Sequence, residues 1–276
     1  MRTIVHLSDL HFGRVDPSIL QPLIYSIRQL APDLVAVSGD FTQRARQRQF
    51  VEARRFLQAV SSPLLVVPGN HDVPLFDVAR RFLSPLGRYR RYIATDLEPV
   101  FRDDEIIAIG LNSARSLTFG RGRLNLPQIR RATARLGEAA AGLIKIVVTH
   151  HPFDLPDDFD STHLVGRAKV AMTELASVGA DLFLAGHLHV SHIGRTAERY
   201  QIAGHNALVV QAGTMSTRQR GEANSFNVLR LNRPNISVER RTWDDGSGTF
   251  TPASLRTFVH TEHGWQEQGL GVGGSG

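Results

Sequence analysis

Six short runs of Val, Ile, Leu and Ala recur along the first two thirds of the sequence, and a helical pattern follows most of them. The runs lie at residues 2–8, 34–39, 64–69, 106–111, 143–149 and 181–186. Continuous apolar residues over so few positions are typical of strands that are covered on both faces. Residues 50–60 and 129–136 place apolar side chains at helical spacing between the runs. The alternation predicts a layered α/β fold with mostly parallel strands in the first half.

The pattern changes after residue 190. Three further runs, at 207–213, 224–232 and 236–243, are joined by short turns and predict a β-rich, antiparallel part. Residues 74–104 form an aromatic and arginine-rich insertion with helical character, for which a substrate lid, a dimer face and plain packing all remain open. Because no repeat or linker divides the chain, we expect one domain over residues 1–268, followed by a flexible Gly-rich tail at 269–276.

Composition limits the chemistry that the chain can carry out. Its 276 residues contain no cysteine, which excludes disulfides, thiolate metal sites and thiol nucleophiles. A transition metal must therefore be held by imidazole, carboxylate or amide groups, which suit manganese, iron or zinc. The net charge is +6, and every basic residue except Lys145 and Lys169 is arginine. Arginine suits phosphate recognition, but genomic composition bias is the favoured explanation of its frequency here. Because no signal-peptide pattern or membrane-length apolar run occurs, we expect a cytoplasmic protein without a membrane partner.

Polar residues follow five of the six apolar runs at the point where each run ends. They occur in SDLHFG, GD, GNHD, HHP and GHLH, as Asp9, His11, Asp40, Asn70, His71, Asp72, His150, His187 and His189. Ligands of open α/β sheets bind beyond the carboxyl ends of strands. Each motif alone has an ordinary alternative, such as a helix cap or an Asn-containing turn. All five together favour two metal ions that share a carboxylate, with the intervening glycines permitting close backbone approach.

The order D-x-H, G-D, G-N-H-D, H, G-H-x-H resembles that of the calcineurin-like metallophosphoesterase superfamily over residues 3–215. The resemblance implies a two-sheet β-sandwich flanked by helices, with two divalent or trivalent ions (manganese, iron or zinc) at the strand ends. The implied ligands of the first ion are Asp9, His11, Asp40 and His189, and those of the second are Asp40, Asn70, His150 and His187. His71 would stand beside the metals, oriented by Asp72, and both are implied catalytic residues.

Within the superfamily, the chain is most similar to the bacterial class III cyclic nucleotide phosphodiesterase and glycerophosphodiesterase-like group. Its size, SDLHFG, GNHD and strand-rich end carry that similarity. Protein serine/threonine phosphatases differ, because they carry G-D-x-x-D-R-G and G-N-H-E where this chain has GDFTQRA and G-N-H-D. Lipid A pathway pyrophosphatases usually have arginine at the position of His71. The repair nucleases share the motifs but usually append DNA-binding segments that are not recognised here.

The resemblance implies hydrolysis of small phosphodiesters such as cyclic nucleotides or glycerophosphodiesters. A metal-activated hydroxide would attack phosphorus in line, while His71 assists the leaving group or binds the phosphate. A metal-dependent nuclease, which would use the basic charge, and a non-catalytic scaffold of the same fold are the alternatives. We expect no stable nucleic-acid partner, and a homodimer stays open.

Further residues are weaker candidates for contact with substrate. Asn112 follows the fourth run, Arg218 lies in GTMSTRQRG, and His192 comes soon after the last metal motif. A solvated loop is the alternative for Arg218, and a surface turn is the alternative for His192. His151 should face away from His150 by strand alternation and play a supporting role.

Overall fold

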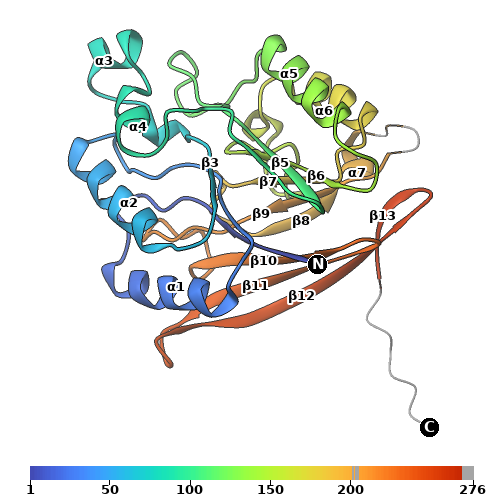
Figure 1. Ribbon diagram of the computed structural model, residues 1–276. Helices are drawn as coiled ribbons and strands as arrows, with labels where there is room; N and C mark the ends of the chain where they lie inside the picture. Colours follow the sequence, from blue (N-terminus) through green and yellow to red (C-terminus); the bar gives the residue numbers. More distant parts are fainter. Residues whose placement is uncertain (201, 203–204, 269–276) are drawn as a thin grey trace.

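The computed structural model, which describes residues 1–200, 202 and 205–268, consists of two β-sheets packed face to face with helices outside (Figure 1). This confirms the predicted two-sheet sandwich. The side chains between the sheets are almost all aliphatic, for example Ile4, Ala36, Ile146 and Leu184. The expected flexible tail at 269–276 lies outside the described residues.

The seven-stranded sheet combines three parallel strands with four antiparallel ones. Its members are β1 (Arg2–Leu7), β2 (Leu34–Val37), β3 (Leu64–Val66), β10 (Ser225–Asn232), β11 (Asn235–Asp244), β12 (Thr249–Thr261) and β13 (Gly264–Glu267). Their order is β13-β12-β11-β10-β1-β2-β3. The first three strands run parallel, and the last four form an antiparallel meander that joins β1 through β10.

The six-stranded sheet has the order β4-β5-β6-β7-β9-β8. Its members are β4 (Val100–Arg102), β5 (Ile106–Leu111), β6 (Ile144–Thr149), β7 (Leu182–Ala185), β8 (His192–Arg195) and β9 (Leu208–Gln211). The antiparallel expectation was wrong for β9, which pairs parallel to β7 and antiparallel to β8. The chain between β7 and β9 is long enough to return to the start of β7, which a parallel pair requires.

Four longer helices cover the outer faces of the sandwich, two on each sheet. The packing of α1 (Pro17–Leu30) and α2 (Gln47–Ala59) buries Leu23 and Phe50 against the seven-stranded sheet. The six-stranded sheet is covered by α5 (Leu126–Gly137) and α6 (Ala168–Ser177), which bury Ile129 and Met172. The start of α5 has a local cause, since Asn125 and Gln128 form a capping box.

Residues 74–104 contain two short helices and one strand. The helices are α3 (Val78–Leu83) and α4 (Gly87–Tyr92), and the strand is β4, which extends the six-stranded sheet. The remaining short elements are α7 (Thr196–Tyr200) and the 3₁₀ turns η1 (Asn70–Asp72) and η2 (Ser161–His163). Among the described residues, no helix combines the length and apolar character needed to cross a membrane.

Candidate metal centre

The polar residues that follow five strands meet at one end of the sandwich. Asp9 and His11 follow β1, Asp40 follows β2, η1 follows β3, His150 follows β6, and His187 and His189 follow β7. Their ligand atoms form overlapping clusters within 4.8 Å, which include Asp9-His11-His189, Asp9-Asp40-His150 and His150-His151-His187. Both sheets supply residues, so the two halves of the sandwich build the site together.

Five of the predicted ligands adopt a left-handed backbone conformation, which is uncommon outside glycine. Their φ angles are 53° at Asp9, 46° at His11, 55° at Asp40, 75° at His187 and 61° at His189. Each such residue costs roughly 1 kcal/mol or more, and residues of this kind cluster at functional sites. Backbone bonds from one motif to the next hold the turns, for example from Asp9 N to the carbonyl of Gly39 at 3.1 Å.

Two motif glycines are required by close approach. A Cβ atom on Gly69 would overlap with the carboxylate and backbone nitrogen of Asp40, and one on Gly186 would overlap with Ser8 Oγ and Asp9 Oδ2. The backbone of each motif therefore lies directly against a predicted ligand from another strand, as the glycine pattern predicts.

The hydrogen bonds of His150 fix which ring nitrogen is free to bind a metal. Its Nδ1 lies 2.7 Å from the carbonyl oxygen of Ser38, which can only accept, so Nδ1 carries the proton. In the neutral ring, Nε2 then carries a free lone pair. This nitrogen lies 3.1 Å from Asn70 Oδ1 and 3.3 Å from Asp40 Oδ2. Nε2 of His150 and the two oxygens near it are all acceptors, and a cation bound between them would satisfy all three.

His189 repeats this arrangement on the other side of the site. Its Nδ1 donates to the carbonyl of Arg218 at 2.7 Å, and its Nε2 lies 3.1 Å from both Asp9 Oδ1 and His11 Nε2. Asp9 Oδ1 is buried and has no hydrogen-bond partner among the described residues. Donors about 2.0–2.2 Å from one metal lie roughly 3 Å apart, so this cluster also fits an ion.

The buried charges of the site need positive charge to balance them. Burial alone would raise the pKa of Asp9, but His189 and His11 outweigh it and hold that pKa well below its usual range. Burial likewise opposes the charged form of His150, yet the adjacent Asp40 carboxylate raises the pKa of His150 to about 9. A cation bound between these groups would take the place of the proton on the ring.

His71 stands beside the clusters and is held from three sides. Its Nδ1 donates to the carbonyl of Gln43 at 2.9 Å, and its backbone N–H donates to Asp40 Oδ1 at 2.8 Å. Its Nε2 lies 3.0 Å from Arg218 Nη1, which also approaches His11 Nε2 at 3.4 Å. Burial lowers the pKa of His71. The arrangement gives a neutral ring whose Nε2 accepts from Arg218.

Asp72 does not orient His71, contrary to expectation. Its carboxylate accepts from the backbone N–H groups of Phe41, Thr42 and Gly69 at 3.2, 2.9 and 2.9 Å, and from Thr42 Oγ1 at 3.0 Å. Both oxygens are engaged by these donors, so the Gln43 carbonyl orients His71 instead. Burial, together with Asp40, raises the pKa of Asp72 to about 7. Asp72 braces the loop after β2 against η1.

The weaker candidates lie in different places. Arg218 is in the site, whereas Asn112 Oδ1 accepts from the backbone of Ala114 in its own loop. His192 lies on β8, with its Nε2 3.4 Å from Asp154 and outside the metal clusters. His151 bonds Ser113 Oγ and the carbonyl of Gly120 through its two ring nitrogens, and its ring centroid lies 4.5 Å from that of His187.

A pocket of about 170 Å³ opens beside the clusters. It is lined by Gln43, Arg44, Asn70, His71, Val73, Leu75, Arg81, Phe119 and Gly120. Arg44 Nη1 lies 3.3 Å from His71 Nδ1, and this residue was missed from sequence, although GDFTQRA places it four positions after Asp40. Phe119 was also missed, because nothing in its loop sequence distinguishes it from an ordinary surface residue.

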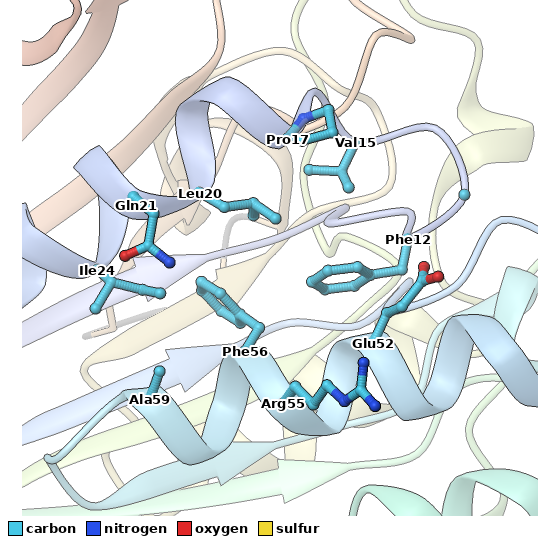
Figure 2. A pocket seen from close by; sticks show the side chains of 11 residues that line it. Phe12, Val15, Pro17, Leu20, Gln21, Ile24, Glu52, Arg55, Phe56 and Ala59 are labelled. Atoms are coloured by element: carbon cyan, nitrogen blue, oxygen red, sulfur yellow. The ribbon is translucent and has the colours of Figure 1, made fainter.

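A roomier apolar pocket of about 470 Å³ lies between α1 and α2 (Figure 2). Phe12, Leu20, Ile24 and Phe56 form much of its wall, with Glu52 and Arg55 among the polar residues that line it. None of the predicted metal ligands lines this pocket, so it lies apart from the candidate metal centre.

Two curated bacterial proteins are similar to parts of the chain. A glycerophosphodiester phosphodiesterase, GpdQ, of Enterobacter lignolyticus is 36% identical over 81 residues, which are 25% of this chain and 29% of that protein. A probable cyclic nucleotide phosphodiesterase of Synechococcus is 26% identical over 160 residues, which are 54% of this chain and 58% of that protein. The matched regions thus span less than two thirds of the length of either relative.

The fold and the motifs both match known proteins over most of the chain. Purple acid phosphatase PPD1 from yellow lupin superposes with a TM-score of 0.70 at 12% identity, covering 93% of this chain and 53% of that one, which shows a shared fold. Residues 2–191, which contain all the predicted metal ligands, match the calcineurin-like phosphoesterase family. The chain therefore belongs to the calcineurin-like phosphoesterase family.

Proposed function

We propose that this chain hydrolyses small phosphodiesters, such as cyclic nucleotides or glycerophosphodiesters, with two bound metal ions. The proposal rests on one observation: the ring nitrogens of several histidines lie close to the carboxylates of Asp9 and Asp40. Carbonyl acceptors behind His150 and His189 turn their Nε2 atoms inward, where only a proton or a metal can satisfy them.

The donor set divides into two groups that share one carboxylate. Asp9, His11, Asp40 and His189 would hold one ion, and Asp40, Asn70, His150 and His187 would hold the other. Mixed nitrogen and oxygen donors suit manganese, iron or zinc. The ions would supply a hydroxide nucleophile near neutral pH and neutralise charge on the phosphoryl oxygens. Because each sheet supplies part of the set, we propose that residues 1–268 act as one domain.

Three side chains beside the donors would handle the substrate. Arg218 and Arg44 place guanidinium groups on either side of the His71 ring, where they can bind non-bridging phosphate oxygens. His71 would assist the leaving group. Because its Nε2 accepts from Arg218, that nitrogen must gain a proton and turn to substrate before it can donate.

The names of the relatives and the size of the pocket support a small diester. One relative is named for glycerophosphodiesters and another for cyclic nucleotides. The pocket of about 170 Å³ beside His71 has room for a small alcohol group. The net charge of +6 is the observation that favours the nuclease alternative. The complete set of metal donors argues against a non-catalytic scaffold.

A substrate panel tests the proposal. Metal-stripped protein would be reconstituted with manganese, iron or zinc and assayed on cyclic AMP, glycerophosphocholine, bis(p-nitrophenyl) phosphate, p-nitrophenyl phosphate and single-stranded DNA, with Asp40→Asn as the inactive control. We expect metal-dependent cleavage of the small diesters above the monoester and the DNA. Efficient DNA degradation with weak action on small diesters would assign the chain to the nucleases, and no cleavage with any metal would favour the scaffold.

A further inference from the structure

Exposed apolar side chains are concentrated in two short segments of this protein. Among the described residues, fourteen large hydrophobic side chains are exposed, and half of them lie within residues 75–83 and 117–119. We call these seven the apolar rim: Leu75, Phe76, Val78, Phe82, Leu83, Leu117 and Phe119. Leu83 is 86% exposed and Leu117 is 78% exposed, so these side chains are not covered by the rest of the fold. Exposed apolar side chains that gather in this way are a common feature of interaction sites.

The two segments are held together by a buried arginine. Arg81 donates through Nε to the carbonyl of Ser116 at 2.7 Å and through Nη1 to the carbonyl of Pro74 at 2.8 Å. Its guanidinium also lies 4.1 Å from the centre of the Phe119 ring. Arg81 therefore links the two segments of the rim, the chain around α3 and the loop after β5 (Figure 1).

The rim borders the mouth of the proposed catalytic site. Leu75 and Phe119 line the same pocket as His71 and Asn70. Phe76 contacts the guanidinium of Arg44, which lies 5.8 Å from its ring centre. A partner that covered the rim would therefore lie directly beside the metal ligands.

The charge around the rim is strongly positive. Residues 74–93 contain five arginines, of which Arg81 is buried, and one acid, Asp77, which pairs with Arg80 at 3.0 Å. Residues 113–123 contain three arginines and no acid. Apolar side chains with arginines around them are suited to a surface whose interior is apolar and whose face is anionic.

We propose that the apolar rim docks on an anionic lipid surface, so that the pocket beside His71 opens next to that surface. A second copy of the chain fits less well, because a two-fold interface would bring the two arginine-rich segments together. Nucleic acid also fits less well, because Leu75, Val78, Leu83 and Leu117 offer nothing to a phosphate backbone. The docking that we propose is peripheral and needs no membrane-spanning helix, and it departs from the expectation of no membrane partner. It does not rest on the proposed hydrolytic activity.

Vesicle co-sedimentation of the full chain tests the proposal. The probes are vesicles of phosphatidylcholine alone and of phosphatidylcholine mixed with phosphatidylglycerol. The test variant is Leu83→Ser with Leu117→Ser, and the matched control is Leu255→Ser, which alters a 56% exposed leucine on β12. We expect the wild type and the control to sediment with the anionic vesicles, and the double variant to bind at least about tenfold more weakly.

Two further measurements separate the possible outcomes. Hydrolysis of soluble bis(p-nitrophenyl) phosphate should be unchanged in the double variant, which shows that the metal centre is intact. Asp40→Ala should still sediment with anionic vesicles, because docking needs no metal, so a failure of the hydrolytic proposal leaves this one standing. Equal binding of the wild type and the double variant would overturn the proposal. Self-association that the double variant abolishes, without vesicle binding by the wild type, would assign the rim to a second copy instead.

Discussion

The guanidinium of Arg218 lies 3.0 Å from Nε2 of His71, although 147 residues separate the two in the chain. The backbone of the same arginine also takes part in the site, because its carbonyl accepts from His189 Nδ1 at 2.7 Å. We propose that Arg218 orients the metal donor His189 through its main chain and binds substrate through its side chain. This separation allows the two roles to be tested independently.

Arg218→Met should weaken catalysis while leaving metal binding intact. The carbonyl that orients His189 remains, but the donor beside His71 is lost. Removal of one such donor typically costs about 10²–10³-fold in rate, and we expect a loss of kcat/KM in that range on bis(p-nitrophenyl) phosphate. Metal analysis of the same preparation is the control. Loss of metal along with activity would mean that the side chain supports the fold of the loop instead of binding phosphate.

Asp40→Ala should lose metal and activity together. Its Oδ2 lies 3.3 Å from His150 Nε2 and 3.6 Å from His11 Nε2, so its removal deprives both proposed ions of a ligand. Asp154→Ala is the matched control, since Asp154 is also a buried, paired carboxylate but pairs with Arg199 and His192. Plasma emission analysis should find metal in the control only. Two equivalents bound by Asp40→Ala would remove Asp40 from the site.

The strand-end residues of the site were predictable because their signals are local. Each ligand motif directly follows an apolar run, and glycines such as Gly69 and Gly186 mark where the backbone must approach a neighbour. The order of the motifs along the chain was therefore enough to predict that Asp9 and His150 belong to one site, although their strands lie in different sheets.

Features that depend on distant pairing were not predictable. The direction of β9 is set by its partner β7, and β12, with Pro252 inside it, does not have the sequence of an ordinary strand. The role predicted for Asp72 was wrong for the same reason, because Asp72 binds backbone N–H groups of a loop some thirty residues away. Sequence spacing carries no information about such contacts.

His6 should make folding stability depend on pH. Burial lowers the pKa of His6 to about 3, whereas the unfolded chain should titrate near 6.5. As pH falls below 6.5, the unfolded state binds a proton that the folded state refuses until about pH 3, so stability is lost within that window. Between pH 7 and pH 5 this amounts to about 2 kcal/mol.

Urea unfolding of the wild type and of His6→Gln, both with EDTA so that metal release does not contribute, measures this effect. The free energy of unfolding should fall less between pH 7 and pH 5 in His6→Gln than in the wild type, by about 2 kcal/mol. The other histidines are common to both proteins and cancel in the comparison. Parallel pH profiles would show that His6 titrates alike in the folded and unfolded states.

His71→Asn should affect substrates according to how basic their leaving groups are. A ribose or glycerol alkoxide needs a proton in the transition state, whereas nitrophenolate is stable as the anion. General acid catalysis typically contributes about 10²–10⁴-fold, so the loss on glycerophosphocholine or cyclic AMP should lie in that range. On bis(p-nitrophenyl) phosphate the loss should be far smaller, with both metals still bound. Equal losses on the two kinds of substrate would mean that His71, with Arg218 at its Nε2, positions the phosphate and donates no proton.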